Sequence, residues 1–355
     1  MPILERLITP SQGSTVFEVT QRCNNDCLYC YNVWKGKQPY PRGEMNTAEA
    51  KGVTSKIRQE CPTRYIAFSG GEPLMRRDIV DLVSHASTLG LIPTLITNGT
   101  LLDDTKVKGL IKAGTRLFEL TLLAPEKSLH NQLCRNYCFD AVLDALVRIK
   151  ENKGRVAVVF VATRLNIPYL EETLKLCLAI GVNSLMLNRL NPGGEALQHM
   201  DELFPSLDEV QRALEIADRF AREYVFNISC GIAMQPCLID TGKFRHIGFG
   251  YCSAGTNRSY YTIDSIGNLR ICNHTPTILG SFLRKPYARL TSRKVIGSFV
   301  KAIPEFCNSC PMRFTCQGGC KAAAQVCYGS IYHKEPFLNK NFKHSRNSTP
   351  SRHCL

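Results

Sequence analysis

The chain has 355 residues, 44% of them hydrophobic and 21% charged, which is ordinary for a soluble globular protein. It contains no run of about 18 apolar residues, which excludes a transmembrane helix, and residues 1–14 lack the basic and apolar regions of a signal peptide. We therefore expect a cytoplasmic protein with no membrane partner. The net charge of +14 suits an anionic cofactor or an acidic peptide, and we do not expect a nucleic-acid partner.

Seventeen cysteines are many for a chain of this kind. A disulfide framework is typical of short, exported proteins with small cores. This chain is long, has ample apolar residues and carries no export signal, so metal ligation is the better interpretation of its cysteines.

Six β-like runs alternate with helical patterns in the first half of the chain. The runs are nearly continuously apolar, as in strands that are covered on both faces. Repeated strand–helix units predict right-handed crossovers and a parallel sheet. Because a closed barrel has eight units, both an open (β/α)6 barrel and a flat doubly wound sheet fit this pattern. The runs are 15–20, 65–70, 92–99, 117–123, 156–163 and 184–190, and the helical stretches are 46–60, 76–89, 103–113, 139–152, 168–180 and 207–223.

The sequence changes character after about residue 225. Residues 230–330 are rich in cysteine, glycine and short turns, and 259–273 has the pattern of a β-hairpin around a Ser-Ile-Gly-Asn turn. We predict an α/β protein in which a partial TIM-like barrel precedes a small Cys-rich domain. The expected parts are an N-terminal extension (1–14), the barrel (15–205), a helix and linker (206–245), the Cys-rich domain (246–330) and a flexible basic tail (331–355).

Three cysteines, Cys23, Cys27 and Cys30, directly follow the first β-run with the spacing C-x3-C-x2-C. The carboxyl ends of parallel strands are where such folds carry their active sites. Zinc sites and iron–sulfur clusters normally take four protein ligands. A cluster on three thiolates leaves one iron open to an external ligand, so the spacing favours a reactive metal centre over three structural cysteines.

With the aromatic Tyr29 between Cys27 and Cys30, this stretch resembles the C-x3-C-x-aromatic-C signature of the radical S-adenosylmethionine (radical SAM) superfamily. The resemblance implies a 4Fe–4S cluster whose open iron binds SAM. It also implies reductive cleavage of SAM to a 5′-deoxyadenosyl radical that abstracts hydrogen from a substrate. Such an enzyme needs a reductant such as flavodoxin or ferredoxin.

Further residues lie where this family contacts SAM. The stretch SGGEP at 69–73 ends the second β-run and matches the family's GGE motif, which binds the SAM amino group. Other matches follow the third, fourth and fifth runs, at positions where Asn and Thr are also common turn residues. The SAM contacts that the resemblance implies are Tyr29, Gly70, Gly71, Glu72, Asn98, Thr121 and Asn166.

The stretch after the fourth β-run departs from the family pattern. Relatives carry an acid and then a base here, whereas this chain has Asn131 and Cys134, which leaves Arg135 as a substitute contact to the SAM carboxylate. Cys134 and Cys138 are a candidate metal pair, although this spacing on a helix more often marks one face. Arg189, at the end of the sixth run, is a candidate contact to adenosine or substrate.

Seven cysteines between residues 252 and 327 follow the pattern C-x14-G-x4-C, then C-x2-C-x5-C-x3-C, then a final Cys. From spacing alone, a zinc ribbon on the four-cysteine block is an alternative. The pattern resembles the SPASM domain of radical SAM enzymes, which carries two auxiliary iron–sulfur clusters. The resemblance implies one cluster on Cys252, Cys272 and Cys320, and another on Cys307, Cys310, Cys316 and Cys327. The first of these clusters has only three cysteine ligands, and Cys230 or Cys237 is a candidate for the fourth.

The resemblance as a whole implies a radical SAM/SPASM oxidoreductase that matures a peptide or protein, by crosslinking or by side-chain oxidation. Because the first β-run starts near residue 15, we expect any leader recognition to come from a separate leader-binding protein or from the surface of this chain. Alternatives within the family are tetrapyrrole side-chain modification in haem-type cofactor synthesis and formylglycine formation in sulfatases. Outside it, the alternatives are an iron–sulfur electron carrier, against which the Gly-Gly-Glu stretch argues, and a zinc-containing nucleic-acid-binding protein.

Overall fold

The computed structural model of the protein describes residues 13–36, 39–256 and 258–341. Most of the expected N-terminal extension and the end of the expected tail lie outside these ranges. In the described residues, eleven strands form one sheet in the order β11-β10-β9-β1-β2-β3-β4-β5-β6-β7-β8. The strands are β1 Ser14–Thr20, β2 Tyr65–Gly70, β3 Ile92–Thr97, β4 Leu117–Thr121, β5 Val156–Ala162, β6 Ser184–Arg189, β7 Ile228–Cys230, β8 Ile247–Phe249, β9 Thr262–Ile263, β10 Asn268–Arg270 and β11 Ile278–Ser281.

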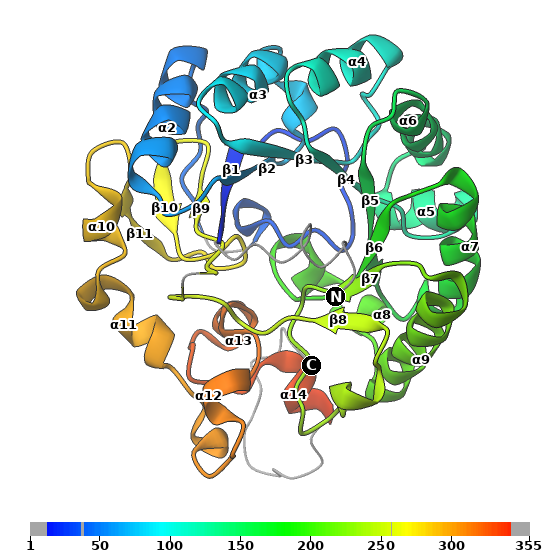
Figure 1. The fold of residues 1–355 in the computed structure, drawn as a ribbon. Coiled ribbons are helices and arrows are strands. Elements are labelled where there is room, and N and C mark those ends of the chain that lie inside the picture. The colour runs from blue at the N-terminus through cyan, green and yellow to red at the C-terminus, as the bar shows by residue number, and fades with distance from the viewer. Residues whose placement is uncertain (1–12, 37–38, 257, 342–355) are drawn as a thin grey trace.

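The sheet is a curved, open barrel. Neighbouring strands from β1 to β8 pair in parallel, as does β1 with β9, and only the β9–β10 and β10–β11 pairs in this sheet are antiparallel. Figure 1 shows the strands arranged around the middle of the molecule with helices outside them. This confirms the partial barrel and excludes the flat sheet. The helices are α2 Thr47–Glu60, α3 Ile79–Thr88, α4 Asp104–Lys112, α5 Lys127–Cys134, α6 Phe139–Glu151, α7 Leu170–Ile180, α8 Met200–Leu203, α9 Leu207–Tyr224, α10 Tyr287–Leu290, α11 Arg293–Lys301, α12 Arg313–Cys316, α13 Lys321–Tyr328 and α14 Pro336–Asn341.

Local sequence signals determine where several helices start and end. Asn46 and Glu49 form a reciprocal capping box before α2, with both hydrogen bonds at 2.9 Å. Ser206 and Glu209 form the same motif before α9. Gly181 ends α7 in the left-handed region, at φ 81°, where a glycine meets no Cβ penalty.

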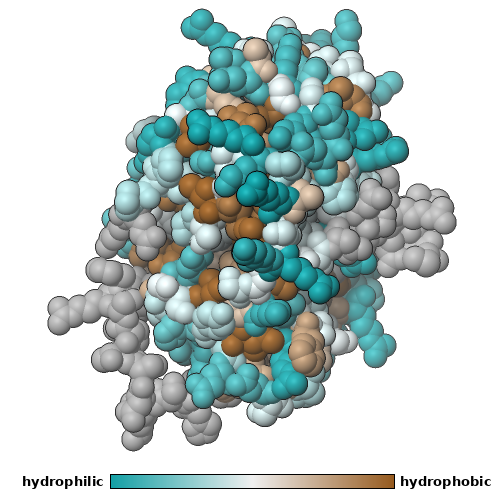
Figure 2. Space-filling view, turned by 90° about the vertical axis from the view of Figure 1, so that its left-hand side faces the viewer, coloured by the Kyte–Doolittle hydropathy of each residue, from teal (hydrophilic) through white to brown (hydrophobic). Residues whose placement is uncertain are grey.

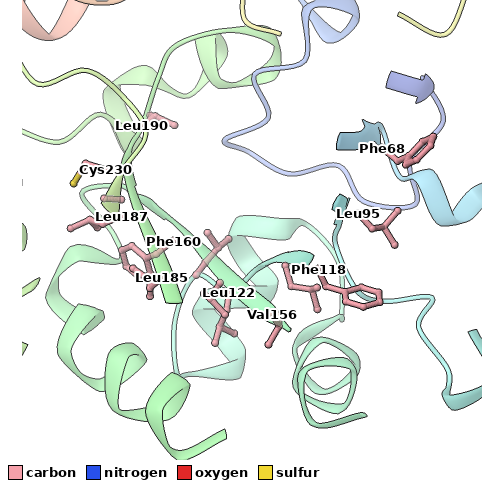
Figure 3. Packing of buried hydrophobic residues seen from close by; sticks show 14 of the residues in the cluster. Phe68, Leu95, Phe118, Leu122, Val156, Phe160, Leu185, Leu187, Leu190 and Cys230 are labelled. Carbon is pink, nitrogen blue, oxygen red and sulfur yellow. The ribbon is translucent and has the colours of Figure 1, made fainter. Parts of the chain in front are cut away.

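Three of the barrel strands, β3, β4 and β6, are covered fully on one face only. In β3, β4 and β6, fully buried residues alternate with partly exposed ones, so the two faces differ more than the apolar sequence runs predict. The buried set packs into one large core, part of which Figure 3 shows with labelled side chains from β2 to β7, among them Phe68, Phe118 and Phe160. The partly exposed face includes Glu119 and Thr121 of β4.

The Cys-rich region is joined to the barrel. The predicted hairpin is present as β9 and β10, and β9 extends the barrel sheet by pairing with β1. At the opposite edge of the sheet, two short strands that were not predicted, β7 and β8, follow β6. β7 lies within the stretch expected as a linker, and β8 lies just after it. The first part of the stretch expected as a flexible tail is instead ordered, because it forms helix α14, on which Phe337 and Leu338 are buried.

Among the described helices, none combines the length and the hydropathy needed to cross a bilayer. Figure 2 shows the side of the molecule that carries α2, α10 and α11 in Figure 1. This face is mainly hydrophilic, with separate hydrophobic patches, as expected for helices that turn their apolar faces to the barrel.

Candidate functional site

The three cysteines lie in a loop, residues 21–32, that leaves the carboxyl end of β1; we call it the cysteine loop. Backbone hydrogen bonds hold it from two sides, because the Leu28 N–H donates to the Leu133 carbonyl at 3.0 Å and the Cys30 carbonyl accepts from the Ala196 N–H at 3.1 Å. A Cβ on Gly194 would lie 2.7 Å from the Cys30 carbonyl oxygen, so the Gly-Gly stretch after β6 allows this close approach.

The Gly-Gly-Glu stretch continues the pairing of β1 and β2 into the site. The N–H of Gly71 donates to the Thr20 carbonyl and that of Glu72 donates to the Arg22 carbonyl, both at 2.8 Å. A Cβ on Gly71 would overlap the Arg22 carbonyl oxygen. The glycine is therefore what lets this stretch lie directly against the cysteine loop.

Glu72 is fully buried, and its carboxylate joins the ends of β2 and β3. It accepts hydrogen bonds from the Thr97 hydroxyl at 2.6 Å, the Asn98 N–H at 2.7 Å and the Leu74 N–H at 3.0 Å. Burial raises the pKa of Glu72 to about 7, against the lowering effect of these three donors. A carboxylate offers about four acceptor positions, so one remains for a cationic donor.

Asn98 ties the third strand end to the cysteine loop. Its Nδ2 donates to Asn24 Oδ1 at 2.9 Å, and Asn24 Nδ2 donates to the Thr100 hydroxyl at 2.7 Å. The structure therefore brings the cysteine loop, the Gly-Gly-Glu stretch and Asn98 together, as predicted. Contact of Asn98 with SAM itself stays a prediction.

Two of the remaining implied SAM contacts, Thr121 and Asn166, differ in their surroundings. Thr121 ends β4 on the partly exposed face of the sheet. Asn166 is fully buried, and its amide donates to the Leu123 carbonyl at 2.9 Å and the Val161 carbonyl at 3.0 Å while accepting two hydrogen bonds from Thr163. Its four hydrogen-bonding positions are therefore used within the protein, where they fix the ends of β4 and β5.

The thiols of the cysteine loop are partly buried. Burial raises the pKa of Cys30 to about 12 and also raises that of Cys23. The pKa of Cys27 is lowered, first by a hydrogen bond from Cys134. Because metal binding requires thiolates, a cationic cluster core would offset the cost of ionising these sulfurs. Three convergent thiols with no disulfide among the described cysteines fit a metal cluster.

Behind the cysteine loop lies a buried group that the sequence analysis found only in part. His130, Cys134 and Cys138 have ligand atoms within 4.8 Å of one another. The two cysteines were considered as a pair, but His130 was missed. It stands one turn before Cys134 on α5, and that i, i+4 spacing is the signal that connects them.

Asn131 and Arg135, in the stretch that departs from the family pattern, have structural partners. Asn131 Oδ1 accepts from the N–H groups of Cys138 at 2.9 Å and Phe139 at 3.0 Å, and so fixes the start of α6. Arg135 pairs with Glu195 at 3.0 Å and with Asp26 of the cysteine loop at 3.4 Å. Its contact with the SAM carboxylate stays a prediction.

Arg189 does not line an open site in this structure. Its side chain is 1% exposed, pairs with Glu335 at 2.6 Å and donates to the Ala233 carbonyl at 3.0 Å. The guanidinium also lies over the Phe337 ring, 4.6 Å from its centre. Arg189, the candidate contact to adenosine or substrate, thus forms a buried ion pair that links β6 to the segment before α14.

The C-terminal cysteines gather in two groups, within each of which every thiol interacts electrostatically with the others. Asn191 Nδ2 donates to Cys320 Sγ at 3.3 Å, next to the first group. Burial raises the pKa of Cys272 to about 12 and of Cys307 to about 11, as in the cysteine loop. The first group is Cys252, Cys272 and Cys320, and the second is Cys237, Cys307, Cys310 and Cys316.

Cys237 therefore lies with the second group, although it was a candidate ligand of the first. The loop that carries it packs on the turn between Cys316 and Cys320, where a Cβ on Gly319 would overlap Gln235 Nε2. On the same turn, a Cβ on Gly318 would lie 3.8 Å from Cys307 Sγ. Cys327 is buried on α13, and its role as a ligand stays a prediction.

The first part of the barrel matches known proteins in sequence. Residues 17–177 match the model of the Radical SAM superfamily. The chain is 30% identical, over 192 residues, to an AdoMet-dependent heme synthase of Oleidesulfovibrio alaskensis, a match that covers 54% of this chain and 48% of that relative. The shared stretch thus spans about half of the curated relative.

Solved structures extend the likeness in fold to nearly the whole chain. Streptococcus suis SuiB bound to S-adenosylmethionine is similar with a TM-score of 0.74 at 15% identity, covering 94% of this chain and 78% of that one. Native anSMEcpe with bound AdoMet is similar with a TM-score of 0.70 at 18% identity, covering 92% of this chain and 94% of that one. Residues 17–177, from β1 into α7, thus match the radical SAM superfamily in sequence, and the chain shares its fold with these solved structures.

Proposed function

We propose that this protein is a radical SAM oxidoreductase that cleaves SAM reductively and modifies a peptide or protein substrate. The observation that carries the proposal is the convergence of three thiols, the Gly-Gly-Glu stretch and Asn98 at the carboxyl ends of β1 to β3. The 4Fe–4S cluster, when bound, supplies the electron for SAM cleavage. A flavodoxin or ferredoxin is the proposed reductant.

Within this proposal, Cys23, Cys27 and Cys30 hold the cluster. Glu72 keeps one acceptor position for the SAM ammonium group, and its three internal hydrogen bonds hold the carboxylate in place for that contact. The Gly-Gly stretch after β6 packs against the backbone of Cys30 and so holds this ligand in position. Thr121, on the partly exposed face of β4, is the proposed contact to the ribose or carboxylate.

We propose two auxiliary iron–sulfur clusters in the C-terminal region. The first is held by Cys252, Cys272 and Cys320. For the second, Cys237 joins Cys307, Cys310 and Cys316, because these four thiols interact with one another in all pairs. Cys327, which the sequence pattern assigns to this cluster, stays the other candidate for the fourth ligand. Four thiolates are what a 4Fe–4S cluster needs for a closed site.

The peptide substrate is supported by the solved structures with this fold. One holds SuiB with the precursor peptide SuiA, and another holds anSMEcpe with the Kp18Cys peptide. The basic net charge of +14 suits an acidic peptide or leader, presented by a separate leader-binding protein. The match to a heme synthase favours a second candidate, the modification of a tetrapyrrole side chain.

The test begins with protein purified without oxygen, in which iron and sulfide are measured. With SAM and dithionite, the wild type is expected to release 5′-deoxyadenosine, and a variant with Cys23, Cys27 and Cys30 changed to alanine is expected to lose about four irons and this activity. Zinc in place of iron, or iron without SAM cleavage, would contradict the proposal. A peptide that increases SAM cleavage supports the first substrate class, and a porphyrin that does so supports the second.

A further inference from the structure

A basic surface covers α10 and α11, on the side of the molecule that Figure 2 shows. Residues 282–301 contain six Lys or Arg residues and no Asp or Glu. All six side chains are exposed, and within the described part of the chain none of them forms an ion pair. We call this region the α11 surface. Its basic residues are Arg284, Lys285, Arg289, Arg293, Lys294 and Lys301.

The acidic residue that contacts the start of α10 is already paired. Glu60 of α2 accepts a hydrogen bond from the Tyr287 N–H at 2.7 Å, and its carboxylate forms an ion pair with Lys56 at 3.3 Å. The positive charge of the α11 surface therefore stays available to a partner. Because side chains of like charge repel one another, an anionic partner is favoured there.

A cavity of about 240 Å³ lies beside α11. Its apolar wall comes from β11, α11 and the loop after α13, and includes Leu279, Phe299 and Ile331. Val295 and Tyr332 also line the cavity and are 38% and 55% exposed, so it opens to the surface beside them. Sites for small molecules usually start at roughly 300 Å³, so this cavity fits one or two apolar side chains better than a separate ligand.

Helical spacing places two lysines of the α11 surface next to this cavity. Ser298 lines the cavity, Lys294 is four residues before it on α11, and Lys301 is three residues after it. Residues three or four apart are neighbours on the surface of a helix. Positive charge thus lies directly beside an apolar opening. A nucleic acid supplies phosphates but no aliphatic side chain, so this combination favours an acidic peptide.

The cavity is also close to the cysteine loop. Gln325, in the cavity wall, accepts a hydrogen bond from the Thr275 hydroxyl at 2.8 Å. Asn273 donates to the hydroxyl of Tyr31, in the cysteine loop, also at 2.8 Å. Three consecutive residues span no more than about 10 Å, so little more than the segment 273–275 separates the cavity from the cysteine loop. A substrate peptide can bridge such a distance between a docked segment and the residue that is modified.

We propose that the α11 surface binds an acidic segment of the substrate peptide. Its carboxylates contact Lys294 and Lys301, and an apolar side chain of the same segment enters the cavity. This inference rests on the proposed function, which names a peptide substrate, and it adds the place and the chemistry of recognition. The docked segment is separate from the residue modified at the cysteine loop, so it positions the substrate and takes no part in the reaction.

The test is fluorescence anisotropy with a labelled synthetic peptide of about ten residues, which spans up to about 35 Å when extended. The peptide consists of glutamates around one central leucine. Lys294→Glu combined with Lys301→Glu is expected to weaken its binding roughly tenfold or more, because attractions between opposite charges become repulsions.

The contribution of the cavity is measured with a second peptide, in which serine replaces the leucine. The wild type is expected to bind it about tenfold more weakly, since no apolar side chain is then buried. Ser298→Phe places a large side chain at the cavity, on an exposed helix position. In this variant the two peptides are expected to bind alike. Equal binding of both peptides to the wild type would overturn the inference.

Lys112→Glu combined with Lys153→Glu is the matched control. Both lysines are exposed and lie at the ends of α4 and α6, far from α11 in Figure 1, so the same charge is removed elsewhere. The control is expected to bind the leucine peptide as the wild type does. Equal weakening in both double variants would overturn the inference. So would tighter binding of an RNA oligonucleotide or of a flavodoxin that is lost in Lys294→Glu with Lys301→Glu, because the surface would then belong to that partner.

Two further results separate this inference from the proposed function. A wild type that holds no iron and releases no 5′-deoxyadenosine overturns the proposed function, and with it the assignment of the bound peptide as a substrate. A wild type that cleaves SAM but does not bind the leucine peptide overturns the inference alone.

Discussion

Arg189 of β6 and Glu335, directly before α14, form an ion pair of 2.6 Å in which both side chains are 1% exposed. The two residues are 146 positions apart, so this pair joins the barrel to the end of the described chain. Gln235 also donates to Glu335, which brings the loop that carries Cys237 into the same network. Burial of two charges is costly, and each partner depends on the other for compensation.

We therefore expect Arg189→Met to lower the free energy of unfolding by about 3–5 kcal/mol, because it leaves a buried carboxylate without its cation. The double variant Arg189→Met with Glu335→Leu is expected to recover most of this loss. Urea unfolding measures both. The exposed pair of Lys108 and Asp104 provides the control, since Lys108→Ala is expected to change stability by less than about 1 kcal/mol. A double variant as unstable as the single one would contradict the argument.

The features that were predicted from the sequence are those with local signals. Cys23, Cys27 and Cys30 lie on one loop and are therefore close together in the sequence. The alternation of strands and helices is likewise visible as a repeating pattern along the chain. The curvature of the sheet was not decided by this pattern. Apolar runs are expected in both a flat and a curved parallel sheet, and the alternation of exposure in β3, β4 and β6 depends on the curvature.

Features that depend on distant contacts were missed. Glu335 lies in a polar, basic stretch, and nothing in that stretch indicates that Arg189 pairs with it. Cys237 lies 70 positions before Cys307, and the second group of thiols forms only because the loop of Gln235 packs on Gly319. The short strands β7 and β8 have three residues each, too few to show a period.

The pH dependence of stability provides a test of the buried carboxyl of Glu72. Its pKa is about 7 in the folded protein, raised by burial, against 4.5 when unperturbed. Between these values the folded state keeps the proton that the unfolded state has lost, so stability from this group falls as the pH rises from about 4.5 to 7. The glutamine in Glu72→Gln is neutral at every pH, so this variant does not show the loss of stability as the pH rises.

We expect the difference in unfolding free energy, wild type minus Glu72→Gln, to decrease by up to about 3 kcal/mol between pH 4.5 and pH 8. Urea unfolding of the two proteins at several pH values measures it, and taking the difference cancels groups that titrate alike in both. A difference that stays constant across this range would show that Glu72 has an ordinary pKa.

Gly71 is expected to be needed for the packing of the cysteine loop. In Gly71→Ala, the new methyl group would overlap the Arg22 carbonyl, so the loop has to move and the variant is expected to lose about 1–3 kcal/mol together with part of its iron. The matched control is Gly52→Ala on α2, where a Cβ meets no described atom within 4 Å. This control is expected to gain about 0.5–1 kcal/mol from the helix propensity of alanine and to keep its iron. Full iron content in Gly71→Ala would contradict the close-packing argument.

Cys237 provides the sharpest test of the auxiliary clusters. With three 4Fe–4S clusters, the protein purified without oxygen is expected to hold about twelve irons, and Cys237→Ala is expected to hold fewer, by up to about four. Cys230→Ala is the control from the preceding strand, because Cys230 is buried in the barrel core. Its iron content is expected to match the wild type. If the iron is lost from Cys327→Ala and retained in Cys237→Ala, the fourth ligand is Cys327, and the proximity of Cys237 to Cys307, Cys310 and Cys316 reflects packing alone.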